Sequence, residues 1–216
     1  MKRRVLALAI SALLLVAAPP SPSVGAEAGT PSAVVEAFQR DLLDIMKQAK
    51  ALGRAGRHQR LLPVIERSFH LTLMIATSSS PYWRKATPDQ RFRLVEAYKR
   101  MSGSVLATYF DDYGGETFET VREREGAQGT VMVDTRVIRT DDSPVDISFV
   151  VARLGDRWWI IDVIVGGGIS EVAVRRSEYQ KLLAEGGIER LIAALAKKAD
   201  DLIAGRIKGG PAGGTP

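Results

Sequence analysis

The sequence lacks cysteine and has only two histidines, His58 and His70, among its 216 residues. Without cysteine, the chain has no disulfide framework, thiolate zinc site, iron–sulfur cluster or thiol nucleophile. Neither histidine has a second histidine or a carboxylate three or four residues further along, so no metal site is predicted. His70 stands two residues from Ser68, but side chains at that spacing do not face each other on a helix, and no G-x-S-x-G motif is present. We therefore predict no catalytic residues and no cofactor.

The chain also lacks an apolar run of the roughly 20 residues that a membrane-spanning helix needs. Residues 1–26 have the pattern of an export signal: three basic residues, a 14-residue apolar run over 5–18, and the small residues Val24-Gly25-Ala26 before a cleavage point. An uncleaved N-terminal anchor is the alternative, but this run is too short to span a bilayer comfortably. We expect a cleaved Sec-type signal peptide and a periplasmic mature protein.

Charge of either sign is not in large excess, with 30 Lys+Arg against 25 Asp+Glu and a formal net charge of +5. Residues 1–26 hold three of the cations and no acid, so the remaining chain carries +2 and gives no electrostatic case for nucleic acid. A hydrophobic content of 45% is too high for a disordered chain. The length predicts one domain over residues 27–208, followed by a disordered Gly/Pro-rich tail over 209–216.

Two hydrophobic periods divide the chain, and together they predict an α+β fold with helices packed on one face of a curved antiparallel sheet of about four strands. The predicted helices cover residues 31–52, 61–68, 71–78, 88–110 and 171–185, and a last one follows Gly186-Gly187. The predicted strands cover residues 116–124, 130–139, 145–154 and 158–165. Thr87-Pro88-Asp89-Gln90 is the clearest local signal, since it has the pattern of a capping box with proline at the first helical position. In the last strand, alternation places Trp159, Ile161, Val163 and Val165 on one face.

Apolar side chains on the helices and on the concave sheet face serve either as an ordinary core or as the lining of a cavity for a hydrophobic ligand. Composition does not separate the two, because a core and a cavity use the same side chains. The predicted cavity residues are Phe69, Leu73, Met74, Tyr82, Trp83, Leu94, Tyr98, Met101, Val133, Ile147, Phe149, Trp159 and Ile161. Gly166, Gly167 and Gly168 follow the last strand and are a candidate hinge.

Several motifs in register resemble one family. The segment YWRKATPDQR over 82–91 resembles the "YWRxATPEQR" start of the central helix in the MlaC family, the toluene-tolerance type periplasmic auxiliary components of lipid ABC transport. Gly168-Ile169-Ser170 and Arg176-Ser177 with Tyr179 match the family's "GIS…RSxF" pattern in the same order. The resemblance covers about residues 32–207.

Two departures from the general pattern are similar to the hopanoid-associated HpnM branch of that family. From Asp162 to Ser170 is eight residues, where the phospholipid-binding pattern has seven. The segment ISEVAVRRSEY over 169–179 and the Gly-Gly-x-x-x-Leu-Ile-Ala-Ala-Leu helix over 186–195 are both similar to HpnM.

The resemblance implies an NTF2-like fold and a lipid carrier that shuttles a hopanoid or phospholipid between membranes, without covalent chemistry. It also implies partners among transporter components at the inner and possibly the outer membrane. An adaptor that docks on the transporter without lipid cargo is one alternative. An NTF2-like isomerase or hydrolase is another, and Asp162 is its only candidate acid or base, unless Asp162 pairs with Arg175 or Arg176.

Overall fold

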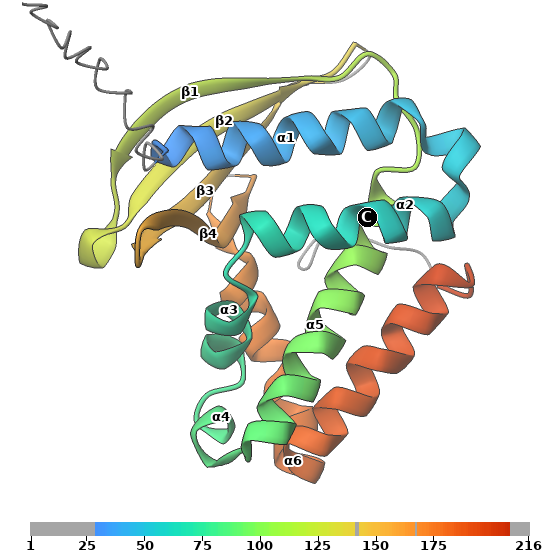
Figure 1. Cartoon of the computed structure of the whole chain (residues 1–216), viewed down its shortest axis with the longest axis vertical. Coiled ribbons are helices and arrows are strands. Elements are labelled where there is room, and N and C mark those ends of the chain that lie inside the picture. Colours follow the sequence, from blue (N-terminus) through green and yellow to red (C-terminus); the bar gives the residue numbers. More distant parts are fainter. Residues whose placement is uncertain (1–28, 141–142, 167, 208–216) are drawn as a thin grey trace, which may run out of the picture.

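Five antiparallel strands form a curved sheet whose spatial order follows the chain (Figure 1). The computed structural model describes residues 29–140, 143–166 and 168–207, so the predicted signal peptide and the predicted tail lie outside the described residues. The strands are β1 (Thr117–Glu125), β2 (Val131–Ile138), β3 (Val145–Leu154), β4 (Arg157–Val165) and β5 (Ile169–Ser170). The predicted α+β class is confirmed, but the sheet has five strands among the described residues instead of about four, because β5 is too short for a period-two pattern to reveal.

The helices divide between the sheet and a separate helical group (Figure 1). They are α1 (Pro31–Lys47), α2 (Ala49–Ser68), α3 (Leu71–Ser78), α4 (Tyr82–Lys85), α5 (Pro88–Tyr109) and α6 (Glu171–Ile203), with a 3-10 turn, η1 (Ala127–Gly129), between β1 and β2. α1 crosses the sheet and contacts β1, β2, β3 and β4, whereas α5 packs mainly on α6, α2 and α3. We call the sheet with α1 the sheet half, and α3 to α6 the helical half; α2 joins them.

The first helical region differs from its prediction as one helix over 31–52. α1 ends at Lys47, α2 starts at Ala49, and Gly53 interrupts α2 with a φ of 60°. Because φ in this range favours glycine, the chain turns here at little steric cost. α2 then continues to Ser68, so its long second part was only partly predicted by the helix over 61–68.

The predicted capping box at the start of α5 is confirmed. The Gln90 backbone N–H donates to Thr87 Oγ1 at 3.2 Å, and the Thr87 backbone N–H donates to Gln90 Oε1 at 3.0 Å. Pro88 occupies the first turn, where its missing N–H removes no helical hydrogen bond. The helix then runs to Tyr109, one residue short of the predicted end.

A β-bulge in β4 overturns the predicted alternation along that strand. Asp162 pairs with Val150 while Ile160 pairs with Val151, so Ile161 is the extra residue. Since directly paired residues share a face, Ile160 lies on the same face as Val163. Trp159 pairs with Ala152 and lies on the opposite face, so its predicted grouping with Val163 and Val165 is wrong. Ile160 is fully buried and takes the core position instead.

Buried apolar residues from all six helices or their flanks and from the sheet form one contact cluster. Phe69, just after α2, extends the sheet by a parallel bridge to Ile160, and the His70 N–H donates to the Ile160 carbonyl at 2.9 Å. This bridge pairs an edge of β4 and fixes the point where the sheet half meets the helical half. Among the described residues, no helix combines the length and the apolar character that crossing a membrane requires.

Candidate functional site

The predicted cavity residues fall into two separate groups. In the sheet half, Val133 and Phe149 are buried and Ile147 is half-buried. Phe149 packs edge-on against Phe38 of α1, with ring centroids 6.1 Å apart, and Phe38 packs the same way against Phe69 at 4.9 Å. Phe38 is therefore the centre of an aromatic trio, although the sequence placed it only within the predicted helix over 31–52.

In the helical half, Met74, Leu94, Tyr98 and Met101 are buried where α3, α5 and α6 pack together. The two aromatic residues of α4, Tyr82 and Trp83, are half-buried and pack against this cluster. Leu73, the last of the predicted cavity residues in this half, is half-buried.

Trp159 lies apart from both groups. It pairs with Ala152 on the sheet face opposite Phe149, its ring is edge-on to His70 at 5.4 Å, and the Arg157 guanidinium lies 3.9 Å from its centroid. The neighbouring Trp158 packs against the core instead. The bulge at Ile161 explains why the two tryptophans exchange the faces that strict alternation assigns to them.

The predicted cavity between sheet and helices stays a prediction, because its side chains pack against one another in this conformation. What the structure presents is an open groove of about 400 Å³ at the edge of the sheet half. The groove is lined by Gly29, Thr30, Ala33, Val34, Ala37, Arg67, Ser68, Arg157 and Trp158. Ala37 and Ser68 are chain neighbours of the trio members Phe38 and Phe69, so the groove borders the aromatic trio.

Small residues one turn apart create this groove. Ala33 and Ala37 leave α1 without side-chain bulk on the side that faces β4 and the end of α2. The spacing of the two alanines is the sequence signal that could have identified this surface.

Two arginines stand at the groove. Arg67 pairs with Asp41 of α1, and Arg157 donates a hydrogen bond to the Arg67 carbonyl. Their guanidinium groups are the donors that suit a phosphate or carboxylate, and apolar surface lies beside them.

A second groove of about 330 Å³ follows α6 and has a different character. It is lined by Leu182, Arg190, Ala193, Ala194, Lys197, Lys198, Asp201 and Ile207. The positive charge of this groove is partly neutralised within it, since Lys197 pairs with Asp201. No aromatic residue lines it, so it offers little to a rigid apolar ligand.

Asp162, the candidate acid or base, caps α6. Its Oδ1 accepts hydrogen bonds from the backbone N–H groups of Val163 at 2.8 Å and Val172 at 3.0 Å, and its Oδ2 accepts from the Ser170 hydroxyl. Ser170 is itself the N-cap and accepts from Ala173. The geometry therefore gives Asp162 the role of tying β4 to the first turn of α6.

Arg175, one of the two partners considered for Asp162, instead pairs within α6. Its guanidinium contacts Glu171 at 2.6 Å and Glu178 at 2.9 Å, and the residue is only 4% exposed. Burial raises the pKa of Glu171, and the charge and hydrogen bonds of Arg175 oppose that rise. Arg175 therefore lies in a buried polar cluster with two tyrosines, Tyr98 and Tyr179, as neighbours.

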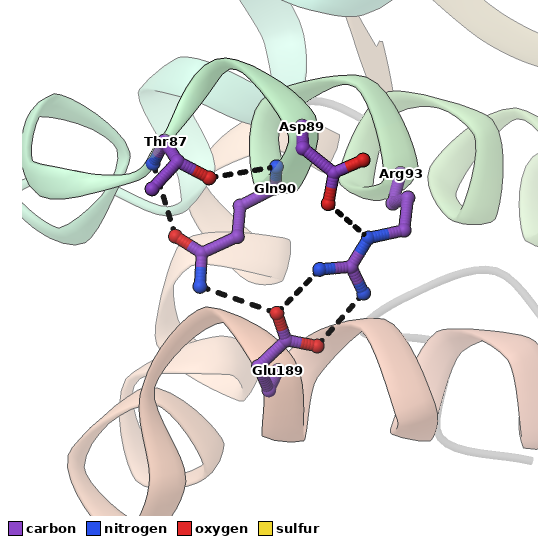
Figure 2. Close-up of polar contacts among 5 residues, drawn as sticks. All are labelled: Thr87, Asp89, Gln90, Arg93 and Glu189. Carbon is purple, nitrogen blue, oxygen red and sulfur yellow. Dashed lines mark hydrogen bonds and ion pairs between the residues drawn. The ribbon is translucent and has the colours of Figure 1, made fainter.

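A polar latch connects the start of α5 to the second part of α6 (Figure 2). Arg93 donates to both carboxylate oxygens of Glu189, at 2.8 and 2.5 Å, and also to Asp89 at 2.7 Å. Gln90 adds a bond to Glu189 at 3.2 Å. Hydrogen bonds from Arg93 and Gln90 lower the pKa of Glu189 to about 2, so it stays ionised at acidic pH values where an ordinary glutamate is protonated.

Glycines interrupt the chain on both sides of the first part of α6. The predicted hinge glycines join β4 to β5, where Gly166 has a φ of 61°, and Gly167 lies outside the described residues. Gly187, with a φ of 62°, breaks α6 where the sequence predicted a new helix. Whether the first group acts as a hinge stays a prediction. In the part of the chain that the structure describes, no group of side chains is arranged to hold a metal ion.

Comparison with known proteins agrees with this fold. The sequence model described as MlaC protein matches residues 36–197. The structure is similar to that of a phospholipid-binding protein from Ralstonia solanacearum solved in complex with a phospholipid, with a TM-score of 0.69. The match covers 81% of this chain and 99% of that one at 18% identity, which shows a shared fold. No curated protein matches the sequence.

Proposed function

We propose, from the premise that this chain belongs to the MlaC protein family, that it carries a lipid through the periplasm without covalent chemistry. The observation that carries the proposal is the open groove beside the aromatic trio, in a fold whose Ralstonia counterpart was solved with a phospholipid. The apolar part of the ligand enters beside α1 and displaces contacts within the trio. Arg67 and Arg157 at the mouth of the groove hold a charged headgroup where the cargo is a phospholipid.

Burial of lipid surface supplies enough free energy for this role. At about 25 cal/mol per Å², a few hundred Å² of hydrocarbon contributes about 10 kcal/mol before the ordering costs of the lipid and the protein are subtracted. The affinity therefore depends on how easily α1 moves away from β4, since the trio fills the space in the conformation described here.

The proposed cargo is a hopanoid or a related polycyclic lipid, with phospholipid as the alternative. The eight-residue distance from Asp162 to Ser170 and the helix over 186–195 support the hopanoid assignment by their likeness to HpnM. Asp162 lies in β4 and Ser170 in β5, and the Ser170 hydroxyl donates a hydrogen bond to Asp162 Oδ2.

Transfer to membrane transporter components is the second part of the proposal. A carrier with a deeply buried lipid releases it only when docking opens the protein, and lid or hinge opening sets the rate of many such steps. Gly166, Gly167 and Gly168 are the candidate hinge, because they follow β4 in the sequence and precede β5, which leads directly into α6.

Mass spectrometry of gently purified protein, followed by lipid extraction, tests the cargo. The wild-type chain should retain one lipid, and Ala37→Trp, which fills the groove, should lower lipid loading about tenfold. Ala193→Trp is the matched control, since it fills the groove along α6 and should leave loading unchanged. A wild-type protein that retains no lipid, and that still binds transporter components in a pull-down, would support the adaptor alternative.

A further inference from the structure

The helical half contains a buried hydroxyl without a partner. Tyr179 of α6 is 3% exposed, and within the described part of the chain its hydroxyl makes no hydrogen bond. A buried hydroxyl that gives up water without gaining a partner destabilises the folded protein, so phenylalanine would be the more stable residue here. A polar atom kept at such a position is suited to a ligand that completes its hydrogen bond.

The groups around Tyr179 already have partners. Arg175, one turn earlier, is held by Glu171 and Glu178. Tyr98 of α5 has Ser102, one turn further along its helix, as a hydrogen-bonding neighbour. The Tyr179 hydroxyl is therefore the donor of this cluster that a bound molecule can engage without breaking an existing ion pair.

Charge around the cluster selects the kind of ligand atom. Arg175 and the half-buried Lys198 face Glu171 and Glu178, and Asp162 adds a further negative charge nearby. The three carboxylates outnumber the two cations, so an anionic phosphate would meet surroundings of net negative charge, which makes its burial costly. Burial raises the pKa of Tyr179 well above its ordinary value, so the hydroxyl stays protonated and is able to donate a hydrogen bond to an uncharged acceptor oxygen.

A ligand group reaches the packed surroundings of Tyr179 only when side chains and helices move. Met74 and Met101 belong to the same core, and methionine side chains repack more readily than branched ones. Gly187 separates residues 188–203 of α6 from the part that carries Tyr179, and the exposed latch of Arg93 and Glu189 holds that segment to α5 (Figure 2).

We propose that the Tyr179 hydroxyl donates a hydrogen bond to an uncharged oxygen of the carried lipid, an alcohol or a carbonyl, inside the helical half. The inference rests on the proposed carrier function and makes the ligand class narrower. The apolar body of the lipid reaches from the groove into the core, and its oxygen-bearing part lies between α5 and α6. A lipid that presents only hydrocarbon to this place leaves the hydroxyl without a partner.

A matched pair of probes tests the proposal: a pentacyclic triterpene alcohol and the hydrocarbon that lacks its single hydroxyl. Affinities of delipidated wild-type protein, Tyr179→Phe and the distant control Tyr113→Phe are measured by tryptophan fluorescence titration. Wild type and Tyr113→Phe should bind the alcohol about tenfold more tightly than the hydrocarbon. Tyr179→Phe should bind the two equally, with its affinity for the hydrocarbon unchanged or improved.

Thermal unfolding without lipid separates a structural role from a ligand-binding one. Tyr179→Phe should be at least as stable as the wild type, since the substitution removes an unpartnered hydroxyl. A Tyr179→Phe protein that keeps the preference for the alcohol overturns the inference alone. A wild-type protein that binds neither triterpene overturns both the proposed hopanoid cargo and the inference. A clear loss of stability in lipid-free Tyr179→Phe shows that the hydroxyl has an internal partner, and it overturns the inference alone.

Discussion

The sheet half and the helical half bury apolar residues in different ways. The sheet half packs α1 on strands through Phe38, Phe69 and Phe149 and has an open groove at its edge. The helical half encloses the charged and hydroxyl groups of Arg175, Tyr98 and Tyr179 within an apolar core, and an exposed latch closes it. The contrast indicates that access for an apolar ligand lies in the sheet half, whereas groups that distinguish one lipid from another lie in the helical half.

The largest expected effect comes from opening the aromatic trio. Phe149→Ala should lower the free energy of unfolding by about 3–5 kcal/mol, because it leaves a cavity beneath α1. Val121→Ala, at a bulge position of β1 that is 47% exposed, is the control and should change little. Chemical denaturation followed by tryptophan fluorescence gives both values. An equally small loss in both variants would mean that α1 already moves freely on the sheet.

The second-largest loss of stability should come from removing the Asp162 contacts that tie β4 to α6. Asp162→Ala removes the acceptor for the Val172 N–H and for Ser170, and it should cost about 2 kcal/mol, as the loss of a strong helix cap does. Asp162→Asn keeps one acceptor oxygen and should lose less. Hydrogen exchange of residues 171–175 locates the effect. Unchanged protection of that first turn in Asp162→Ala would show that Ser170 alone caps α6.

Acid should weaken the sheet half through Asp134. Burial alone would raise its pKa, but hydrogen bonds from Ser148, Arg124 and Arg122 lower the pKa to about 2. Because the pKa is lower in the folded state, this contribution is complete above the ordinary value of 3.8 and is lost as the pH falls toward 2. Denaturation curves at pH 5, 3.5 and 2.5 should show a smaller acid-induced loss for Asp134→Asn than for the wild type. Equal losses would contradict the assignment.

The smallest effect on global stability should come from the latch. Arg93 and Glu189 are 40% and 53% exposed, and exposed ion pairs contribute little and are screened by salt. Glu189→Gln should therefore leave the denaturation midpoint nearly unchanged. Hydrogen exchange over residues 188–203 should nevertheless become faster, and Glu185→Gln, which affects only weak pairs at 4.0 Å, is the control. Equal exchange rates in both variants would show that the Arg93–Glu189 latch does not hold residues 188–203 against α5.

Local chemistry made much of the fold predictable. The capping box of Thr87 and Gln90 and the β3 bounds of 145–154 depend on neighbouring residues, and both were predicted correctly. The continuation of α2 through Gly56 depends on packing of its buried face, including Leu61 and Ile65, which local propensity does not report.

The candidate site was less predictable, because it depends on residues that the fold brings together. Phe69 and Phe149 were predicted as cavity residues, but their link through Phe38 needs the position of α1 on the sheet. The missing partner of Tyr179 is a property of its surroundings, so the sequence of α6 gave no sign of it.

The bulge at Ile161 also affects how related sequences should be compared. Before it, even-numbered residues of β4, such as Ile160, face the core; after it, odd-numbered residues such as Val163 do. Consider a relative whose strand lacks the extra residue. An alignment without a gap at Ile161 would then match interior positions of one protein with exterior positions of the other on one side of the bulge. Substitutions transferred from such an alignment would then place polar side chains in the interior, although each looks conservative in the sequence.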